Sequence, residues 1–448
     1  MASVTKAMEQ EAAVSLRSLL MPALSAYYLS EARLLRMRAQ TESRRQRRSE
    51  PHEALYFHQS DDPYSALLVQ VLPTLARRYG VRIKPLVVPP PEDSAAPDRG
   101  RLVAYSRRDA ELLARRHGLD FADPGRQPEA LRVAQANAAL VRAVEQGDFW
   151  SVAPQVTQEL WQPDARASES EPASESTTSA QLQQAQRLRK GLGHYLGGTL
   201  YYGGEWYWGI DRLHHLEARW QALGLGTGLS PLFAPELDGQ APQGVAPGQQ
   251  IDFFFSLRSP YSAIAAPRIF RMGELSSTPV RLRYVLPMVM RGLPVPAEKR
   301  KYISLDAARE ARLRGVPFGR INDPLGRPTE RGLALMPLAE SLGAGQRYVL
   351  SFMQGVWAEG LDAGSDRGLK TIAQRAGISW DTAQDTLHQD AQGQGGWRKV
   401  AEANRLEMTG LGLWGVPSFR VGDFSTWGQD RLWAVQQALM QGTVRPKA

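Results

Sequence analysis

The strongest constraint on the fold is an internal repeat of domain length. Residues 57–65 read FHQSDDPYS, and residues 254–262 read FFSLRSPYS, which places Asp62 against Ser259 at an offset of 197 residues. The same offset relates four further pairs: Tyr105 and Tyr302, Asp109 and Asp306, Gly118 and Gly315, Phe121 and Phe318. A later match between 208–213 and 427–432 has an offset of 219 residues, so the first copy is 22 residues shorter between these blocks. A period this long predicts a duplicated domain rather than a solenoid.

Composition narrows the class of protein. The 448 residues are 43% hydrophobic and 22% charged, which is typical of globular domains, and the length suits two domains with extensions. No apolar run of about 18 residues is present, and residues 1–9 lack the apolar core of a signal peptide, so we expect a cytoplasmic protein. The chain contains no cysteine. Any thiol chemistry must therefore use a thiol that a ligand supplies.

The N-terminal segment, 1–50, is predicted to be an amphipathic helix followed by a basic arm. Apolar residues recur at helical spacing over 10–40, and Pro22 inside this pattern predicts a kink or break. Arginines gather between 33 and 48 and carry part of the net charge of +8. Such an arm can bind nucleic acid or an anionic membrane. The interpretation we favour is a solvated helix face, with neither nucleic acid nor membrane as a partner.

Two segments are predicted to be linkers. Residues 164–180 are polar, acidic and poor in apolar side chains, which predicts a disordered excursion inside the first copy. Residues 223–249 are rich in glycine and proline and separate the copies. The predicted domains are therefore 51–222 and 250–441.

Each copy begins with a strand, a helix and a second strand. The predicted strands are 54–57 and 81–88 in the first copy, and 251–255 and 280–286 in the second. A βαβ unit of this kind favours parallel pairing. In the second copy a helical block follows from 302 to 409, then a hairpin that begins at 418–421, and a final helix over 430–439. This order predicts an α/β protein of two thioredoxin-like domains, each with a helical insertion between its βαβ and ββα parts.

The second copy resembles the 2-hydroxychromene-2-carboxylate isomerases and kappa-class glutathione transferases, within the DsbA-like thioredoxin superfamily. The resemblance extends over 251–440. It rests on six motifs in order: Asp252 followed by Ser259–Ser262, Tyr302 with Asp306, Gly315–Pro317, Trp357–Gly360, Gly415–Phe419, and Trp427–Arg431. It implies that glutathione is the cofactor.

Ser259 is the candidate catalytic residue. Serine followed by proline is the ordinary start of a helix, in which the hydroxyl accepts a backbone N–H. The same position offers free N–H groups and a positive dipole end to an anion. The resemblance implies that the Ser259 hydroxyl donates a hydrogen bond to the glutathione sulfur and favours its thiolate.

Five residues are candidates for glutathione binding. Val416 and Pro417 resemble the cis-proline loop, in which the residue before proline offers its backbone to the bound thiol; an ordinary strand-edge proline is the alternative. The resemblance implies that Asp430 meets the γ-glutamyl ammonium and Gln429 the α-carboxylate, whereas helix capping is the alternative for Asp430. Lys299 matches a basic position that can meet a glutathione carboxylate.

Tyr261, Trp357 and Trp427 are the candidate lining of a pocket for an aromatic substrate, although aromatics at such spacings are often core residues. No clustered metal ligands and no phosphate-binding glycine motif occur in the sequence, so no metal site or nucleotide site is predicted.

The first copy departs from the pattern at two positions that matter for this chemistry. It has Asp62 in place of Ser259 and Gly198 in place of Pro417. A carboxylate would repel a thiolate, so we expect this copy to be catalytically silent. Because kappa-like enzymes are typically dimers, the first copy is predicted to stand in for a second subunit, which would make the chain a monomeric pseudo-dimer.

The resemblance implies an isomerase in which glutathione thiolate adds to an unsaturated aromatic or carbonyl compound and then leaves. Two alternatives stay open. One is a kappa-type glutathione transferase, in which the adduct is released. The other is a non-catalytic thioredoxin-fold protein that binds partners.

Overall fold

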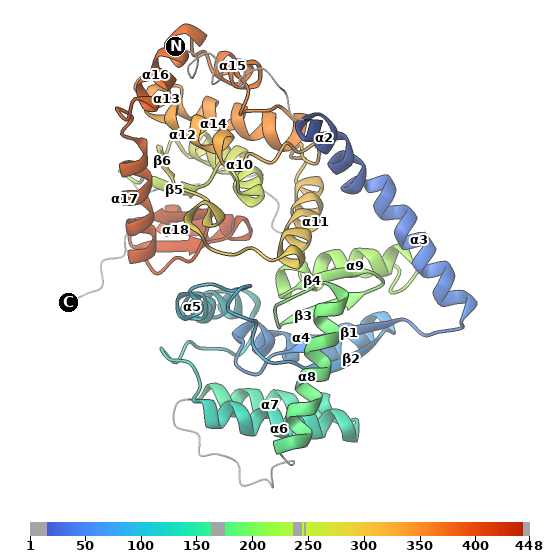
Figure 1. Cartoon of the computed structure of the whole chain (residues 1–448). Helices are drawn as coiled ribbons and strands as arrows, with labels where there is room; N and C mark the ends of the chain where they lie inside the picture. Colours follow the sequence, from blue (N-terminus) through green and yellow to red (C-terminus); the bar gives the residue numbers. More distant parts are fainter. Residues whose placement is uncertain (1–15, 163–174, 236–243, 246–247, 442–448) are drawn as a thin grey trace, which may run out of the picture. The chain divides into compact units, whose positions relative to one another are not determined.

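A computed structural model describes residues 16–162, 175–235, 244–245 and 248–441 (Figure 1). The described chain forms two compact units. The first unit comprises Leu34–Pro235 and Pro294–Tyr302, and the second comprises the remaining described residues. The segment up to Arg33 therefore groups with the C-terminal half of the chain, and a short piece of the second copy groups with the first unit.

The first unit is built on a four-stranded sheet of order β2-β1-β3-β4. Strand β1 (Glu53–His58) pairs in parallel with β2 (Arg82–Val87) and antiparallel with β3 (Thr199–Tyr202), which continues through a hairpin to β4 (Glu205–Trp208). Its helices are α3 (Glu31–Arg47), α4 (Pro63–Tyr79), α5 (Arg99–His117), α6 (Ala130–Gln146), α7 (Phe149–Trp161), α8 (Glu175–Leu192) and α9 (Leu213–Ala222). Helices α6 and α7 pack side by side (Figure 1).

The second unit repeats this arrangement in a sheet of order β6-β5-β7-β8. Strand β5 (Ile251–Phe255) pairs in parallel with β6 (Val280–Tyr284) and antiparallel with β7 (Ser418–Val421), which forms a hairpin with β8 (Phe424–Trp427). Its helices are α2 (Leu16–Tyr28), α10 (Pro260–Ser276), α11 (Ala297–Leu313), α12 (Arg327–Ala334), α13 (Met336–Ser341), α14 (Gly345–Gln354), α15 (Asp366–Arg375), α16 (Trp380–Ala391), α17 (Trp397–Gly410) and α18 (Leu432–Gln441). The first residues of α11, up to Tyr302, group with the first unit. A π-helical turn, Gly355–Glu359, continues α14.

The central strand β5 carries the core of the second unit. All five of its residues are buried, as expected for a strand that helices cover on both faces. The Phe253 ring stacks on Phe255 and Phe419, with centroids 5.0 and 5.5 Å apart. Asp252 is the exception to this apolar pattern. Burial alone would raise the pKa of its carboxyl, but hydrogen bonds from Arg281 and Arg420 outweigh that effect and lower the pKa.

The two units share more than strand order. In the first unit the Tyr64 hydroxyl donates to Oδ2 of Asp109 over 2.8 Å, and in the second the Tyr261 hydroxyl donates to Oδ2 of Asp306 over 2.7 Å. These are the residue pairs that the 197-residue offset relates. The predicted thioredoxin-like order of strand, helix, strand, helical insertion, hairpin and helix is confirmed in both units.

Two expectations for non-core segments need correction. Part of the predicted disordered excursion, residues 175–180, is the first turn and a half of α8, in which the Thr178 side chain is buried; the remainder, up to 174, lies outside the described residues. The chain also continues as helix through Pro22, so a break there, one of the two predicted outcomes, does not occur; the helix ends later, at Leu29 and Ser30. The break falls there because the Ser30 hydroxyl accepts the N–H of Arg33 and so starts α3. Residues 10–15 of the predicted helix and 236–243 of the predicted linker are likewise outside the described parts.

Candidate functional site

Ser259 lies where β5 gives way to α10. Its backbone is extended, Pro260 follows as the first helical residue, and its Oγ accepts the N–H of Ser262 over 3.1 Å. The predicted helix-start geometry is therefore present. The same hydroxyl also donates to the Val416 carbonyl oxygen at 3.4 Å, which is a long contact. A helix N-terminus and a loop 157 residues away thus meet at one half-buried hydroxyl.

The loop that Ser259 contacts is the one before β7. The Val416–Pro417 peptide bond is cis, which confirms the predicted conformation of this loop. Two residues earlier, Trp414 lies edge-on to Trp427, with ring centroids 5.3 Å apart. A Cβ atom at Gly415 would lie 3.1 Å from Nε1 of Trp427, so a larger residue there would crowd the Trp427 ring. The half-buried Trp414 was not predicted, although its position before the cis-proline motif was a usable signal.

The three predicted pocket aromatics have different surroundings. Trp427 is half-buried beside Trp414. Tyr261 is half-buried too, but its hydroxyl binds Asp306 and its ring packs against a small cluster that contains Ile264. Trp357 belongs to the main core: it is 6% exposed, and its indole N–H donates to the Leu257 carbonyl. Trp427 and Trp414 therefore form a half-buried aromatic pair, and Trp414 belongs to the loop that contains Val416, whereas Trp357 is a core residue.

Gln429 and Asp430 were predicted at the start of the last helix, and they lie in the short 3-10 turn Gln429–Arg431 that precedes α18. Their side chains differ. Gln429 is 1% exposed, and both ends of its amide are engaged: Oε1 accepts from Arg268 over 2.5 Å, and Nε2 donates to Glu310 over 2.9 Å and to Asp430. The Asp430 side chain is 21% exposed. Gly428 precedes this turn and makes no side-chain capping hydrogen bond.

Lys299 groups with the first unit. The residue is 5% exposed, and its ammonium donates to the Ala95 carbonyl over 2.8 Å and lies 5.6 Å from the centroid of the Tyr195 ring. Burial lowers the pKa of this ammonium to about 8. The segment 294–302 belongs to the first unit, whereas Ser259 belongs to the second.

Sequence reasoning missed Arg268, Glu310 and Arg314, which surround Gln429. Glu310 is fully buried, and its Oε2 lies 3.2 Å from Nη1 of Arg314. The signal was available in the repeat. The first copy has apolar residues at the positions equivalent to Arg268 and Glu310. A charged residue in place of a buried apolar one is unusual in a core and marks a candidate functional position.

The equivalent location in the first unit is chemically different. Asp62 starts α4, and its Oδ2 accepts the N–H of Ser65 over 3.0 Å and the Ser65 hydroxyl over 2.9 Å. Burial raises the pKa of the Asp62 carboxyl to about 7. Gly198, in the place of Pro417, has φ of 59°. This location therefore presents a protonatable carboxyl where the second unit presents a hydroxyl.

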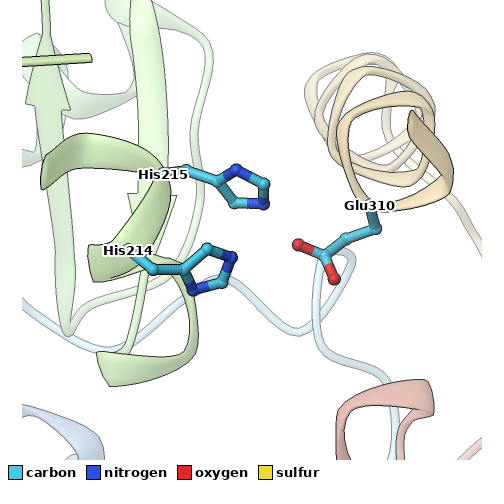
Figure 2. Close-up of side chains that lie close together, drawn as sticks. All are labelled: His214, His215 and Glu310. Carbon is cyan, nitrogen blue, oxygen red and sulfur yellow. The ribbon is translucent and has the colours of Figure 1, made fainter. Parts of the chain in front are cut away.

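Two neighbouring histidines lie in the first unit. His214 and His215 leave the first turn of α9 side by side, with ring centroids 4.1 Å apart (Figure 2). Figure 2 also draws Glu310, which belongs to α11 and, unlike the two histidines, to the second unit. Among the described residues, no helix combines the length and apolar character that spanning a bilayer requires.

Comparison with known proteins finds a family match for one segment of the chain. The family model described as a DSBA-like thioredoxin domain matches residues 250–440. No curated protein matches the chain. Among solved structures, a 2-hydroxychromene-2-carboxylate isomerase is 22% identical, with 43% of this chain and 94% of that chain covered and a TM-score of 0.37. A probable DsbA oxidoreductase from Streptomyces coelicolor is 18% identical, with 45% and 93% covered and a TM-score of 0.36. The cytosolic disulfide reductase DsbM from Pseudomonas aeruginosa, solved with GSH, is 19% identical, with 43% and 93% covered and a TM-score of 0.32.

Proposed function

Given a DsbA-like thioredoxin domain at residues 250–440, we propose that this domain binds glutathione and isomerises an unsaturated aromatic or carbonyl compound. One observation carries the proposal. The Ser259 hydroxyl lies at the N-terminus of α10 and within 3.4 Å of the Val416 carbonyl oxygen. A hydroxyl, a helix N-terminus and the backbone of Val416 are groups that can bind a cysteinyl ligand.

The chemistry follows from the missing cysteine. The chain has no thiol of its own, so a nucleophilic sulfur must arrive with the ligand. Hydrogen-bond donors and the positive end of a helix dipole stabilise a thiolate more than a thiol, and thereby lower the thiol pKa. When glutathione binds, the Ser259 hydroxyl turns from the Val416 oxygen to the sulfur and stabilises the thiolate.

The reaction needs no further reagent. In the substrate, an alkene is conjugated with a carbonyl group. The thiolate sulfur bonds to the alkene carbon farther from the carbonyl, and the π electrons move to the carbonyl oxygen, which gives an enolate. The former double bond is now single and rotates. The enolate then reforms the double bond and expels the thiolate, so that glutathione is not consumed. If the enolate is protonated before expulsion, the product is a glutathione adduct and the same site acts as a transferase.

The contacts to the rest of glutathione are proposed from exposure and charge. Asp430 is the best-placed partner for the γ-glutamyl ammonium, because its carboxylate is partly exposed in the turn before α18. The Val416 backbone meets the cysteinyl part. Gln429 and Lys299 are both buried and bind protein groups, so neither is needed for this proposal. The aromatic substrate would lie on Trp414 and Trp427.

The first unit is proposed to support the second without catalysis. The Asp62 carboxyl occupies the place of Ser259, and once ionised it repels a thiolate. The chain would then act as a monomeric pseudo-dimer in the cytoplasm. Sedimentation or gel filtration at twice the chain mass would contradict the monomer.

Calorimetry of glutathione binding, with thiolate absorbance recorded in parallel, tests the proposal. We expect the wild-type chain to bind glutathione with a thiolate signal, Ser259→Ala to lose that signal, and Asp62→Ala to keep it as the matched control. Unsaturated aromatic acids then form the substrate panel, and product mass separates an isomer from an adduct. Binding without turnover would favour the non-catalytic alternative, and no binding by the wild type would reject the proposal.

A further inference from the structure

Helix α2 packs on the second unit through one of its faces. Pro22 on this face is buried. The Ser25 hydroxyl accepts the N–H of Ile321 over 2.8 Å, and the carbonyl of the buried Leu29, just past the end of the helix, accepts a hydrogen bond from Arg312 over 2.9 Å. Residues three, four or seven apart lie on one side of a helix, so these contacts define the face by which α2 is held.

The opposite face of α2 is apolar and exposed. Leu20, Leu24 and Tyr27 follow one another at spacings of four and three residues, and each is 58% exposed. Met21, beside Leu20, is 40% exposed. The other described large apolar side chains that are more than half exposed lie singly on separate segments: Leu35, Leu131, Leu342 and Leu406. Single exposed apolar residues are ordinary, whereas a row of them on one helix face marks an interaction site.

Three arginines of the second unit lie beside α2: Arg33, Arg312 and Arg320. The guanidinium groups of the first two donate to the carbonyls of Tyr28 and Leu29, at the C-terminal end of the helix. The third lies nearer its middle, because Pro22 and the Arg320 side chain both lie against Gly360. The surroundings of α2 in this unit are therefore rich in cations.

The acidic residues close to these contacts have other arginines as partners. Asp323 forms an ion pair with Arg258 at 2.7 Å, and Glu359 forms one with Arg375 at 2.5 Å. These two negative charges are therefore balanced locally. Glu31, in the first turn of α3, sets one negative charge against the three arginines beside α2. The net charge next to the exposed apolar row is positive.

The chain after α2 adds further positive charge. Only two residues separate α2 from α3, and residues 33–48 hold seven arginines and one glutamate. No residue of α3 is buried, and Arg36, Arg44 and Arg47 are exposed. Each cation close to a bilayer surface that contains anionic lipid strengthens the attraction to it.

An anionic bilayer surface matches both properties of α2. Its acyl chains can take up Leu20 and Leu24, its headgroup region suits the amphipathic ring of Tyr27, and its phosphates attract the arginines. A second copy of this chain matches only the apolar row, because two α2 faces in contact would bring two sets of like charges together.

We propose that α2 is a peripheral membrane anchor that lies in the plane of an anionic bilayer surface, with Leu20 and Leu24 inserted between the headgroups. The sequence alone favours a solvated face for the N-terminal segment, and the exposed apolar row is the structural observation that favours lipid instead. The inference does not depend on the proposed glutathione chemistry, because none of these residues takes part in it.

Flotation of the full chain with vesicles tests the proposal. One set of vesicles consists of phosphatidylcholine, and in the other set a third of the lipid is phosphatidylglycerol. We expect the wild type to bind the anionic vesicles about tenfold more tightly than the neutral ones. Binding should weaken as salt is raised, because salt screens the attraction between arginines and lipid phosphates. Equal binding to the two sets, or no flotation with either, would overturn the proposal.

The apolar row is tested by the double variant Leu20→Gln, Leu24→Gln, which keeps good helix formers on α2. We expect its affinity for anionic vesicles to fall about tenfold or more, because the inserted apolar surface is lost. The matched control is Leu131→Gln, Leu342→Gln, which changes two leucines that are 70% and 53% exposed on other segments. It should bind like the wild type. Equal losses in the two variants would show non-specific adhesion and reject the anchor.

The charge beside α2 is tested by Arg320→Glu, for which we expect a loss of about fivefold in affinity for anionic vesicles. Its control is Arg187→Glu, at an exposed position of α8, which should bind like the wild type. Thermal midpoints equal to that of the wild type are expected for all these exposed substitutions. Gel filtration without lipid should give the monomer. A dimer that Leu20→Gln, Leu24→Gln converts to a monomer would assign the apolar row to a second copy of the chain and overturn the proposal.

Discussion

The carboxylate of Asp62 lies in the space that a side chain at residue 198 would need. A Cβ atom built on Gly198 would be 2.5 Å from Oδ2 of Asp62 and 3.3 Å from the Ser65 amide nitrogen. In the second unit the corresponding positions hold Ser259 and Pro417. Aspartate at the helix start and glycine in the facing loop therefore fit each other sterically, and a larger residue at 198 is incompatible with the carboxylate as placed.

Gly198→Ala is expected to destabilise the first unit by about 1–3 kcal/mol, since the new Cβ meets Asp62 and the backbone has φ of 59°. Urea unfolding measures this loss. Asp62→Ala in the Gly198→Ala background should recover the steric part of the loss and leave the backbone part. Losses that simply add in the double variant would show that the two residues are not coupled.

The Asp62 carboxyl should make stability depend on pH. Its pKa is about 7 in the folded chain and about 3.9 when unfolded, so the folded state holds the extra proton between these values. Stability from this group is therefore lost as pH rises from about 4 through 7. We expect the thermal midpoint of the wild type to fall over this range relative to that of Asp62→Asn. Burial also raises the pKa of the neighbouring Asp61 carboxyl, so the substitution should reduce the slope without abolishing it. Parallel curves for the two proteins would contradict this expectation.

Ser259→Cys would give the chain its sole cysteine, at the N-terminus of α10. Free N–H groups and the helix dipole favour a thiolate there, so we expect a thiol pKa below the ordinary value of about 8.5. The pH dependence of the alkylation rate by iodoacetamide measures it. The control is Ser341→Cys, an exposed position at the C-terminal end of α13, where the dipole has the opposite sign. Equal thiol pKa values in the two variants would remove the electrostatic basis of the proposed site.

Tyr261→Phe should cost about 1–3 kcal/mol of stability, because it removes the donor that lies 2.7 Å from the buried Asp306 carboxylate. Tyr64→Phe removes the equivalent donor to Asp109 in the first unit and should cost a similar amount. Denaturant unfolding of both variants measures the two losses. A change of less than about 0.5 kcal/mol in either would show that the shared hydrogen bond contributes little to that unit.

The backbone structure of the candidate site could be predicted from the sequence, whereas the contacts of its side chains could not. The strands, the start of α10 and the cis bond before Pro417 follow from local patterns and from family resemblance, and all three are present. The surroundings of Trp357 and Lys299 depend on which distant residues pack against them. Trp357 was predicted as pocket lining, but its indole N–H binds a backbone carbonyl of the core. The contact of Lys299 with Ala95 joins residues 204 positions apart, which no local pattern encodes.

The sequence alone determined that two similar α/β units are joined in one chain, that the chain has no thiol, and that only the second copy combines serine with proline at the key positions. These properties reside in residue identity and spacing. The tertiary structure decided that the Ser259 hydroxyl reaches Val416, that Gln429 is buried while Asp430 is partly exposed, and that Asp62 fills the space beside Gly198. These depend on packing between segments more than a hundred residues apart, where the available volume and the competing hydrogen-bond partners exist only once the chain has folded.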